Sequence, residues 1–195
     1  MEWSQTLNSK SQLHDHTRSA RKNFYCDNIP TIKKKFFNFR HLIEVFEFKM
    51  NRRLEQNGQF LDIRISPSTF DFFCGDPQQI NNLLDNLCSH GACFSGNGVL
   101  ILDIDFLPIS EKHYAINLVL TISGSRIPRK VLQTIFQPEI RLGRKDESFM
   151  LPKLFIAKTI TSTMGGEISV ENTFGFGTRY NAMLKMEVAG GYEMF

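Results

Sequence analysis

Hydrophobic and polar residues alternate near the C-terminus in a way that predicts a β-hairpin. Ile168 and Val170 alternate with polar neighbours, which indicates a strand with one buried and one solvated face. Gly175 and Gly177 then bracket a tight turn. The alternation resumes through a second set of apolar positions, which are Tyr180, Ala182, Leu184 and Met186. Two antiparallel strands joined by a glycine turn are therefore expected here.

The segment before the hairpin predicts a helix. Residues 154–164 carry apolar side chains that we place on one helical stripe, at Leu154, Ile156, Ala157 and Ile160. The segment ends in Gly165-Gly166, and glycine is the residue that most often ends a helix. The order helix, double glycine, strand, Gly-x-Gly-Thr, strand is specific enough to organise the rest of the chain.

The remaining patterns divide the chain into further strands and helices. The expected strands are 37–39, 60–66, 70–73, 100–106 and 116–122, and the expected helices are 40–56, 77–94 and 128–136. A polar loop is expected over 137–148. The sum predicts an α+β fold, a two-layer α/β sandwich with a mixed, mainly antiparallel sheet and three helices on one face.

The helix over 77–94 has a clear start and a polar side. Asp76 is a good N-cap residue, and Pro77 occupies the first helical position. Asn82, Asn86 and His90 follow at intervals of four residues, which places them along one side of the helix. A solvated helix face explains these three side chains more simply than a ligand site does.

Composition is that of a soluble globular protein. The chain has 195 residues, of which 42% are hydrophobic and 22% charged, which suits one domain with an appendage. No apolar run reaches the length of a bilayer span, and no signal peptide is evident, so we expect a cytoplasmic chain or the cytosolic part of a membrane-anchored sensor. The four cysteines, Cys26, Cys74, Cys88 and Cys93, form no C-x-x-C pair and are expected to be reduced and structural.

Charge is distributed unevenly along the chain. Residues 1–40 hold eight basic and three acidic residues, whereas residues 41–195 carry a formal charge of −2. We interpret 1–35 as a basic polar arm or linker, 36–187 as the folded domain and 188–195 as a tail. The arm lacks the interleaved aromatic residues of a nucleic-acid surface, so a solvated linker is favoured over contact with nucleic acid or acidic lipid.

The order of elements and three motifs resemble the catalytic, ATP-binding domain of sensor histidine kinases, a Bergerat-fold domain of the GHKL superfamily. Residues 75–87 are similar to the lead into the N box of that family. Residues 135–138, Ile-Phe-Gln-Pro, are similar to the F box, and residues 164–178 to the final glycine motif. The resemblance covers residues 36–187.

Departures from the family pattern fall on the nucleotide motifs. The resemblance implies two asparagines that handle the triphosphate and Mg²⁺, but the second position here is His90, and neutral imidazole is a poor Mg²⁺ ligand. Asn86 keeps the first position, and Asn82 lies where related ATPases place a water-activating polar residue. Cys93 stands where the family has a lysine.

The adenine and lid motifs also depart from the family pattern. Gly124 keeps the first glycine of the Asp-x-Gly-x-Gly motif, but Ile122 replaces the aspartate and Arg126 the second glycine. An adenine amine without its acceptor costs about 1–3 kcal/mol. Phe149, Leu151 and Lys153 replace the lid glycines, so side chains stand where main-chain N–H groups would cradle phosphate.

These departures predict a degenerate, pseudo-kinase domain that acts as a docking or regulatory module in a two-component phosphorelay. Its partner would be a response-regulator receiver or a histidine-phosphotransfer domain, without a small-molecule substrate, DNA or a cofactor. No catalytic residue or metal site is expected. The vestigial nucleotide positions would be Asn82, Asn86, His90, Gly124, Gly175, Gly177 and Thr178, with Asn86 and His90 at the former Mg²⁺ position.

Other readings of the sequence stay open. The main alternative is a divergent kinase or ATPase domain that still uses Mg²⁺–ATP, with Arg126 or Lys153 supplying the missing positive charge. A third is a spacer or dimerisation module. A narrower resemblance is to the kinase-like domain of the phosphotransfer intermediate in the Rcs capsule phosphorelay. About 35 residues before the domain cannot supply a phosphoacceptor hairpin, so no autophosphorylation is expected from this chain alone.

Overall fold

The computed structural model describes residues 32–67, 71–96, 98–123, 126–137, 151–173 and 177–188, without the side chains of 151 and 152. The chain divides into two units, Met1–Thr31 and Ile32–Phe195, of which the second contains all described residues. Nearly all of the predicted arm (1–35), of the predicted polar loop (137–148) and of the predicted tail (188–195) therefore lies outside the described residues. The domain boundaries remain predictions.

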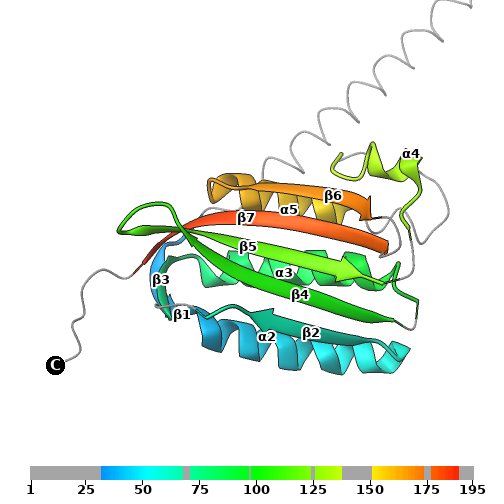
Figure 1. Ribbon diagram of the computed structural model, residues 1–195, viewed down its shortest axis with the longest axis horizontal. Coiled ribbons are helices and arrows are strands. Elements are labelled where there is room, and N and C mark those ends of the chain that lie inside the picture. The colour runs from blue at the N-terminus through cyan, green and yellow to red at the C-terminus, as the bar shows by residue number, and fades with distance from the viewer. Residues whose placement is uncertain are drawn as a thin grey trace, which may run out of the picture. The chain divides into compact units, whose positions relative to one another are not determined.

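A single mixed sheet forms one layer of the domain (Figure 1). Its strands are β1 (Lys35–Asn38), β2 (Phe60–Ile65), β3 (Phe72–Gly75), β4 (Val99–Pro108), β5 (His113–Ile122), β6 (Glu167–Thr173) and β7 (Gly177–Val188). They follow the order β1-β3-β7-β5-β4-β2, with β6 also paired to β7. Only β2 with β4 is a parallel pair among the described strands. The predicted mixed, mainly antiparallel sheet is confirmed, as is the antiparallel pairing of the two predicted hairpin strands, β6 and β7.

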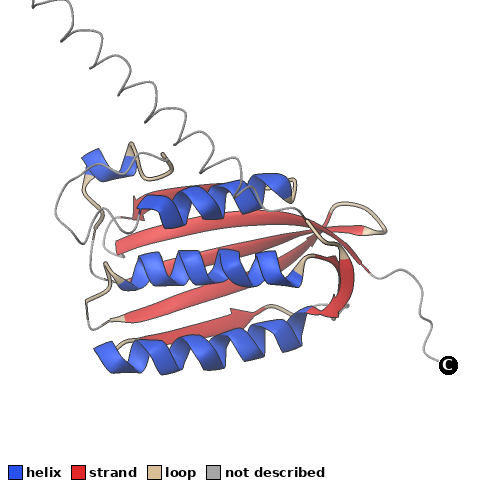
Figure 2. Cartoon of the chain, turned by 180° about the vertical axis from the view of Figure 1, so that it is seen from behind, coloured by secondary structure: helices blue, strands red, loops and turns tan. Residues whose placement is uncertain are grey.

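Three long helices cover one face of this sheet. They are α2 (Phe39–Leu54), α3 (Pro77–Ala92) and α5 (Leu151–Thr163), and Figure 2 shows them lying side by side across the sheet. The short 3₁₀ helix η1 (Glu55–Asn57) follows α2, and Gly58 ends it in the left-handed conformation (φ 65°). The helix expected over 128–136 is shorter, because only α4 (Arg129–Leu132) is α-helical and turns follow it. The predicted two-layer sandwich is confirmed.

The core lies between the helices and the inner face of the sheet. The inward-facing apolar residues of the central strands and of α3 are buried, among them Leu102, Leu120, Leu184, Leu84 and Leu87. In the described part of the chain, no helix is long and apolar enough to cross a membrane. Cys74, Cys88 and Cys93 are free thiols, and Cys26 lies outside the described residues.

The predicted apolar stripe of α5 is wrong at one position. Ile156 is 42% exposed, whereas Leu154, Ala157 and Ile160 are buried as expected. Thr161 is buried in its place, and its hydroxyl donates to the Ala157 carbonyl at 2.7 Å. The threonine is tolerated in the core because its hydroxyl is satisfied within its own helix.

The double glycine after α5 has two different tasks. Gly165 adopts φ 71°, which side chains disfavour, and its N–H donates to the Ser162 carbonyl at 3.0 Å. A Cβ atom on Gly166 would overlap the Met183 carbonyl oxygen of β7. Gly165 therefore supplies the left-handed conformation that ends the helix, and Gly166 the space for the close approach of β7.

The free edge of β2 is protected by a side chain of α2. Asn51 Nδ2 donates to the Leu61 carbonyl at 3.0 Å, and the Leu61 N–H donates to Asn51 Oδ1 at 2.7 Å. The amide thus occupies two of the groups that a further strand would pair with, which partly protects this edge from association.

Candidate functional site

Helix α3 carries the central residues of the candidate site, and its N-terminus is held as predicted. Asp76 Oδ1 accepts hydrogen bonds from the N–H groups of Gln78 and Gln79 at 3.0 and 3.1 Å. Its second oxygen accepts from the Lys33 N–H at 2.8 Å. Asp76 therefore fixes both the start of α3 and the chain that leads into β1.

The two asparagines lie half-buried on α3 and make mostly local contacts. Asn86 Nδ2 donates to the Asn82 main-chain carbonyl, one turn earlier, at 2.8 Å. Asn82 Nδ2 makes only a long contact with Gln79 Oε1, at 3.5 Å. Both amides lie on the partly solvated side of the helix, as the sequence pattern predicted.

His90 lies between α3 and the sheet, so the expectation of a solvated face is wrong for this residue. Its side chain is 1% exposed. Nδ1 and the hydroxyl of Tyr180 on β7 are hydrogen-bonded at 2.9 Å, and the tautomer of the ring decides which group donates. The rings of Phe94 and Tyr180 pack against the imidazole with centroids 5.1 and 5.6 Å away. The side chain is enclosed on the sheet side of the helix.

Burial keeps both members of this pair neutral. Desolvation lowers the pKa of His90 to about 3, with a further contribution from the positive charge of Lys153. Desolvation also raises the pKa of the Tyr180 hydroxyl, and Cys93 adds to this effect. At physiological pH the contact therefore joins an uncharged imidazole and an uncharged phenol.

Ile122 fills the position at which the family has an aspartate. It is fully buried at the end of β5, between Leu100 of β4 and Thr178 of β7. Its Cδ1 atom lies 2.8 Å from the place where a Cβ atom on Gly91 would stand. Helix α3 and strand β5 are thus in close contact here, and a Cβ atom at position 91 would require the Ile122 side chain to shift.

Thr178 and Gly177 begin β7, where an asparagine that the sequence analysis missed joins three segments. The Thr178 hydroxyl donates to Asn172 Oδ1 at 3.0 Å. Asn172 also accepts from the Ile127 N–H at 3.1 Å and donates to the Ile127 carbonyl at 2.8 Å. Asn172 follows the strand alternation of β6, so no periodic signal distinguishes it. Gly124 and Gly175 lie outside the described residues.

The lid end of α5 lies beside the C-terminal end of α3. Lys153, in the first turn of α5, lines a hollow of about 520 Å³ together with Ser89 of α3, Cys93 just after α3 and Arg53 of α2. Arg53 is held there because it donates to Asp85 at 2.6 Å and to the Ser89 hydroxyl at 2.7 Å. Among the residues that the structure describes, two cationic groups and no carboxylate line the hollow. Phe149 lies outside the described residues, as does the side chain of Leu151.

Gln59 is a second residue that the sequence did not single out. Its side chain is buried, and Nε2 lies 2.6 Å from the carbonyl oxygens of Ala92 and Gly96 at the end of α3. Gln59, Ala92 and Gly96 all line the hollow. Among the described residues, no group of three or more His, Cys, Asp or Glu side chains is arranged to hold a metal ion.

Comparison with solved structures supports the fold. The mycobacterial sensor histidine kinase MprB superimposes with a TM-score of 0.59 at 17% identity, covering 80% of this chain and 99% of that one. The catalytic domain of the histidine kinase ThkA gives a TM-score of 0.58 at 18% identity, covering 80% of this chain and 95% of that one.

Sequence relatives are much longer than this chain. Sensor protein EvgS of Escherichia coli O157:H7 is 27% identical over 115 residues, which are 58% of this chain and 10% of that protein. Sensor protein GacS of Pseudomonas syringae pv. syringae is 29% identical over 119 residues, which are 59% of this chain and 13% of that protein. The family described as histidine kinase-, DNA gyrase B-, and HSP90-like ATPase matches residues 75–188. The chain therefore belongs to this family of ATPase domains and has the fold of histidine kinase catalytic domains.

Proposed function

We propose that this domain is a pseudo-kinase module of a two-component phosphorelay, which docks a protein partner and does not use Mg²⁺–ATP. The observation that carries the proposal is the enclosure of His90. A Mg²⁺ ligand must present a lone pair to an ion beside phosphate oxygens, and an imidazole held against Tyr180 beneath its own helix does not.

The contact between Ile122 and Gly91 also argues against nucleotide binding, because it affects the position where the adenine base would bind. An adenine amine needs an acceptor at the end of β5, and an aliphatic side chain packed against α3 offers none. Opening a cavity there would also separate two closely packed elements. The residues at both positions therefore do not fit Mg²⁺–ATP.

The proposed partner is a receiver or a histidine-phosphotransfer domain. The similar proteins are sensor proteins and histidine kinases, including hybrid signal transduction histidine kinase L of Dictyostelium discoideum, which is 22% identical over 155 residues. A domain of this family that had lost nucleotide would keep a rigid sandwich as a docking surface. Phosphoryl chemistry would then take place on other domains.

One observation favours the alternative, a divergent ATPase. The hollow lined by Lys153 and Arg53 places two cationic groups beside Cys93, where the family has its lysine. Phosphate oxygens could be neutralised there without the usual residue.

An ATP turnover assay with a matched variant separates the two functions. We expect no phosphate release above background from the purified chain. Should release be seen, Asn86→Ala decides its origin, because this amide is the retained member of the nucleotide pair. Release that Asn86→Ala abolishes would overturn the pseudo-kinase function, whereas release that it leaves unchanged would come from a contaminant.

A further inference from the structure

Residues 126–137 lie beside the hairpin of β6 and β7, and we call this segment the α4 strap. Figure 1 shows α4 next to the end of the hairpin at which β6 ends and β7 begins. Ile127 and Ile135, near the two ends of the strap, are each 1% exposed. Between them, α4 contains no buried residue, and its two apolar side chains are half-buried. The strap is therefore attached to the domain mainly at its two ends.

Asn172 of β6 fastens the N-terminal end of the strap to the hairpin. Its amide nitrogen donates to the Ile127 carbonyl at 2.8 Å, and its amide oxygen accepts from the Ile127 N–H at 3.1 Å. The Thr178 hydroxyl donates to the same amide oxygen at 3.0 Å and so helps to orient the amide. One side chain thus satisfies both main-chain groups of a buried residue, as a neighbouring strand otherwise would.

Main-chain hydrogen bonds within the strap hold its own conformation. The N–H groups of Val131 and Leu132 donate to the Pro128 carbonyl at 2.8 and 3.1 Å. Further along, the Thr134 N–H donates to the Val131 carbonyl at 3.0 Å, and the Gln137 N–H donates to the Thr134 carbonyl at 2.9 Å. Because donor and acceptor both belong to the strap, these hydrogen bonds can persist when the strap moves as one unit.

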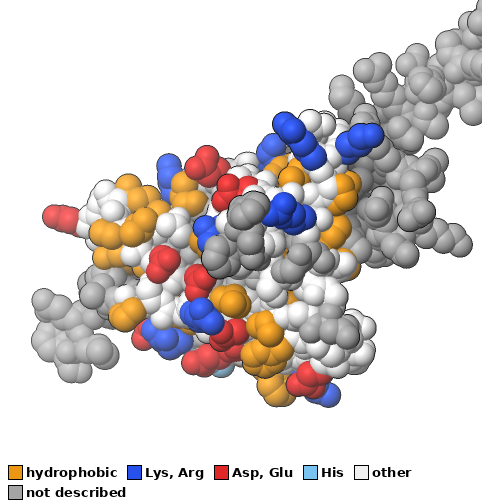
Figure 3. All heavy atoms as spheres, turned by 45° about the vertical axis from the view of Figure 1, so that its right-hand side comes forward, with side chains coloured by type: hydrophobic (Ala, Val, Ile, Leu, Met, Phe, Trp, Pro, Cys, Tyr) orange, Lys and Arg blue, Asp and Glu red, His pale blue; other side chains and the backbone are white. Residues whose placement is uncertain are grey.

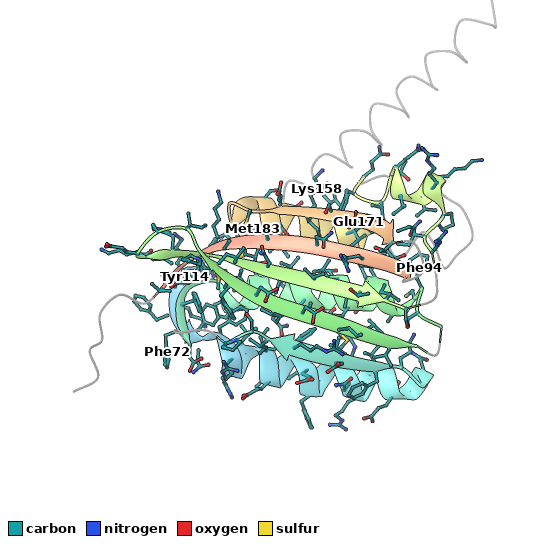
Figure 4. The ribbon with its side chains drawn as sticks, viewed as in Figure 1. Phe72, Phe94, Tyr114, Lys158, Glu171 and Met183 are labelled. Carbon is teal, nitrogen blue, oxygen red and sulfur yellow. The ribbon has the colours of Figure 1, made fainter. Side chains whose placement is uncertain are left out.

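The outer side and the C-terminal end of the strap are held weakly. Its three basic side chains are exposed, and Figure 3 shows Lys and Arg side chains near the upper edge of this end of the domain. Phe136 is half-buried, with its ring centroid 5.5 Å from Nζ of Lys158, which Figure 4 labels on α5. Such a cation–π contact contributes little at an exposed site. Asn172 is itself exposed, so water can replace its hydrogen bonds to the strap.

We propose that Asn172 is a latch, and that the α4 strap opens as one unit when the hydrogen bonds between Asn172 and Ile127 break, while the sandwich stays folded. Segments with few buried side chains open at a lower free energy than the core does. In the latched state Ile127 and Ile135 are buried, and in the open state they are exposed. The two states therefore differ in the apolar surface beside the hairpin. This conformational change goes beyond the proposed function and does not depend on it.

Amide hydrogen exchange followed by NMR tests the latch in the folded chain. In Asn172→Ala we expect exchange in the strap to become about tenfold faster, because both hydrogen bonds of the latch are lost. The informative amides are those of Thr134 and Gln137, since their acceptors lie within the strap. Amides of α3 and β5 should exchange as in the natural chain. The control Asn181→Ala removes an amide of β7 that makes a long contact of 3.5 Å, and it should leave exchange in the strap unchanged.

Each result supports or overturns the latch. Acceleration at Thr134 and Gln137 by the same factor as at Ile127 supports a strap that opens as one unit. Acceleration at Ile127 alone would overturn the proposal, because Asn172 would then hold a single residue. If strap amides of the natural chain exchange as slowly as those of β5, the strap opens only when the whole domain unfolds, which also contradicts a latch. Uniform acceleration throughout Asn172→Ala would have the same meaning.

Discussion

His90 joins α3 to the sheet, and its neutral ring is part of the core. The hydrogen bond to Tyr180 and the packing on Phe94 replace the solvation that a polar helix residue would otherwise have. Restoring an asparagine here would therefore have a structural cost before it could have a functional benefit.

We expect His90→Asn to destabilise the domain by about 2 kcal/mol, because the Tyr180 hydroxyl loses its partner and the ring contacts disappear. Urea denaturation at neutral pH measures this loss. The control Asn82→Ala, on the same helix, removes only a long contact and should change the free energy of unfolding by less than about 0.5 kcal/mol. Equal effects of the two substitutions would show that His90 is not a core residue.

The low pKa of His90 makes stability depend on pH. Its pKa is about 3 in the folded chain and close to 6.5 when unfolded, so the unfolded chain binds the proton more readily between these values. Stability should therefore fall as pH drops below about 6.5, by up to about 1.4 kcal/mol per pH unit from this group. Urea denaturation at pH 7, 6 and 5 should show this loss of stability in the natural chain and not in His90→Asn. Identical pH dependence in both would contradict the neutral, buried imidazole.

At the scale of elements, hydrophobic periodicity predicted the residues in the middle of each helix's buried stripe more accurately than the residues at the edges of that stripe. Four residues advance about 40° around a helix axis, so the step from Asn82 to His90 turns about 80°, from the solvated edge to the sheet. The residues share one side over a single turn only. Ile156 was misplaced for a similar reason, because it lies two residues, about 200°, beyond Leu154.

The double glycine after α5 could be recognised in the sequence, but the contact that requires Gly166 could not. Gly166→Ala should destabilise the domain by about 3 kcal/mol, because its Cβ atom would meet the Met183 carbonyl on a paired strand that cannot move alone. Gly165→Ala is the matched control, with an expected cost of about 1 kcal/mol from its φ of 71° alone. Thermal unfolding of the two variants compares them. A larger loss for Gly165→Ala would contradict this division of tasks.

At the scale of the whole domain, the sequence predicted the sandwich because strands and helices differ in hydrophobic period. The sheet order was less accessible, since pairing of β1 with β3 or of β2 with β4 depends on contacts between segments far apart in the chain. The candidate-site residues that belong to a family motif were predicted from the sequence. Asn172 and Gln59 were missed, because their partners are main-chain groups of distant segments that no local pattern reveals.

A nucleotide titration followed by calorimetry and thermal shift tests most directly whether this domain binds Mg²⁺–ATP. A ligand at 100 times its Kd adds about 2.7 kcal/mol of stability, which a melting curve readily detects. We predict no heat of binding and no shift of the melting temperature with millimolar ATP or ADP and Mg²⁺. A saturable shift would contradict the proposed pseudo-kinase function, because it would mean that the enclosed His90 and the buried Ile122 still leave room for nucleotide.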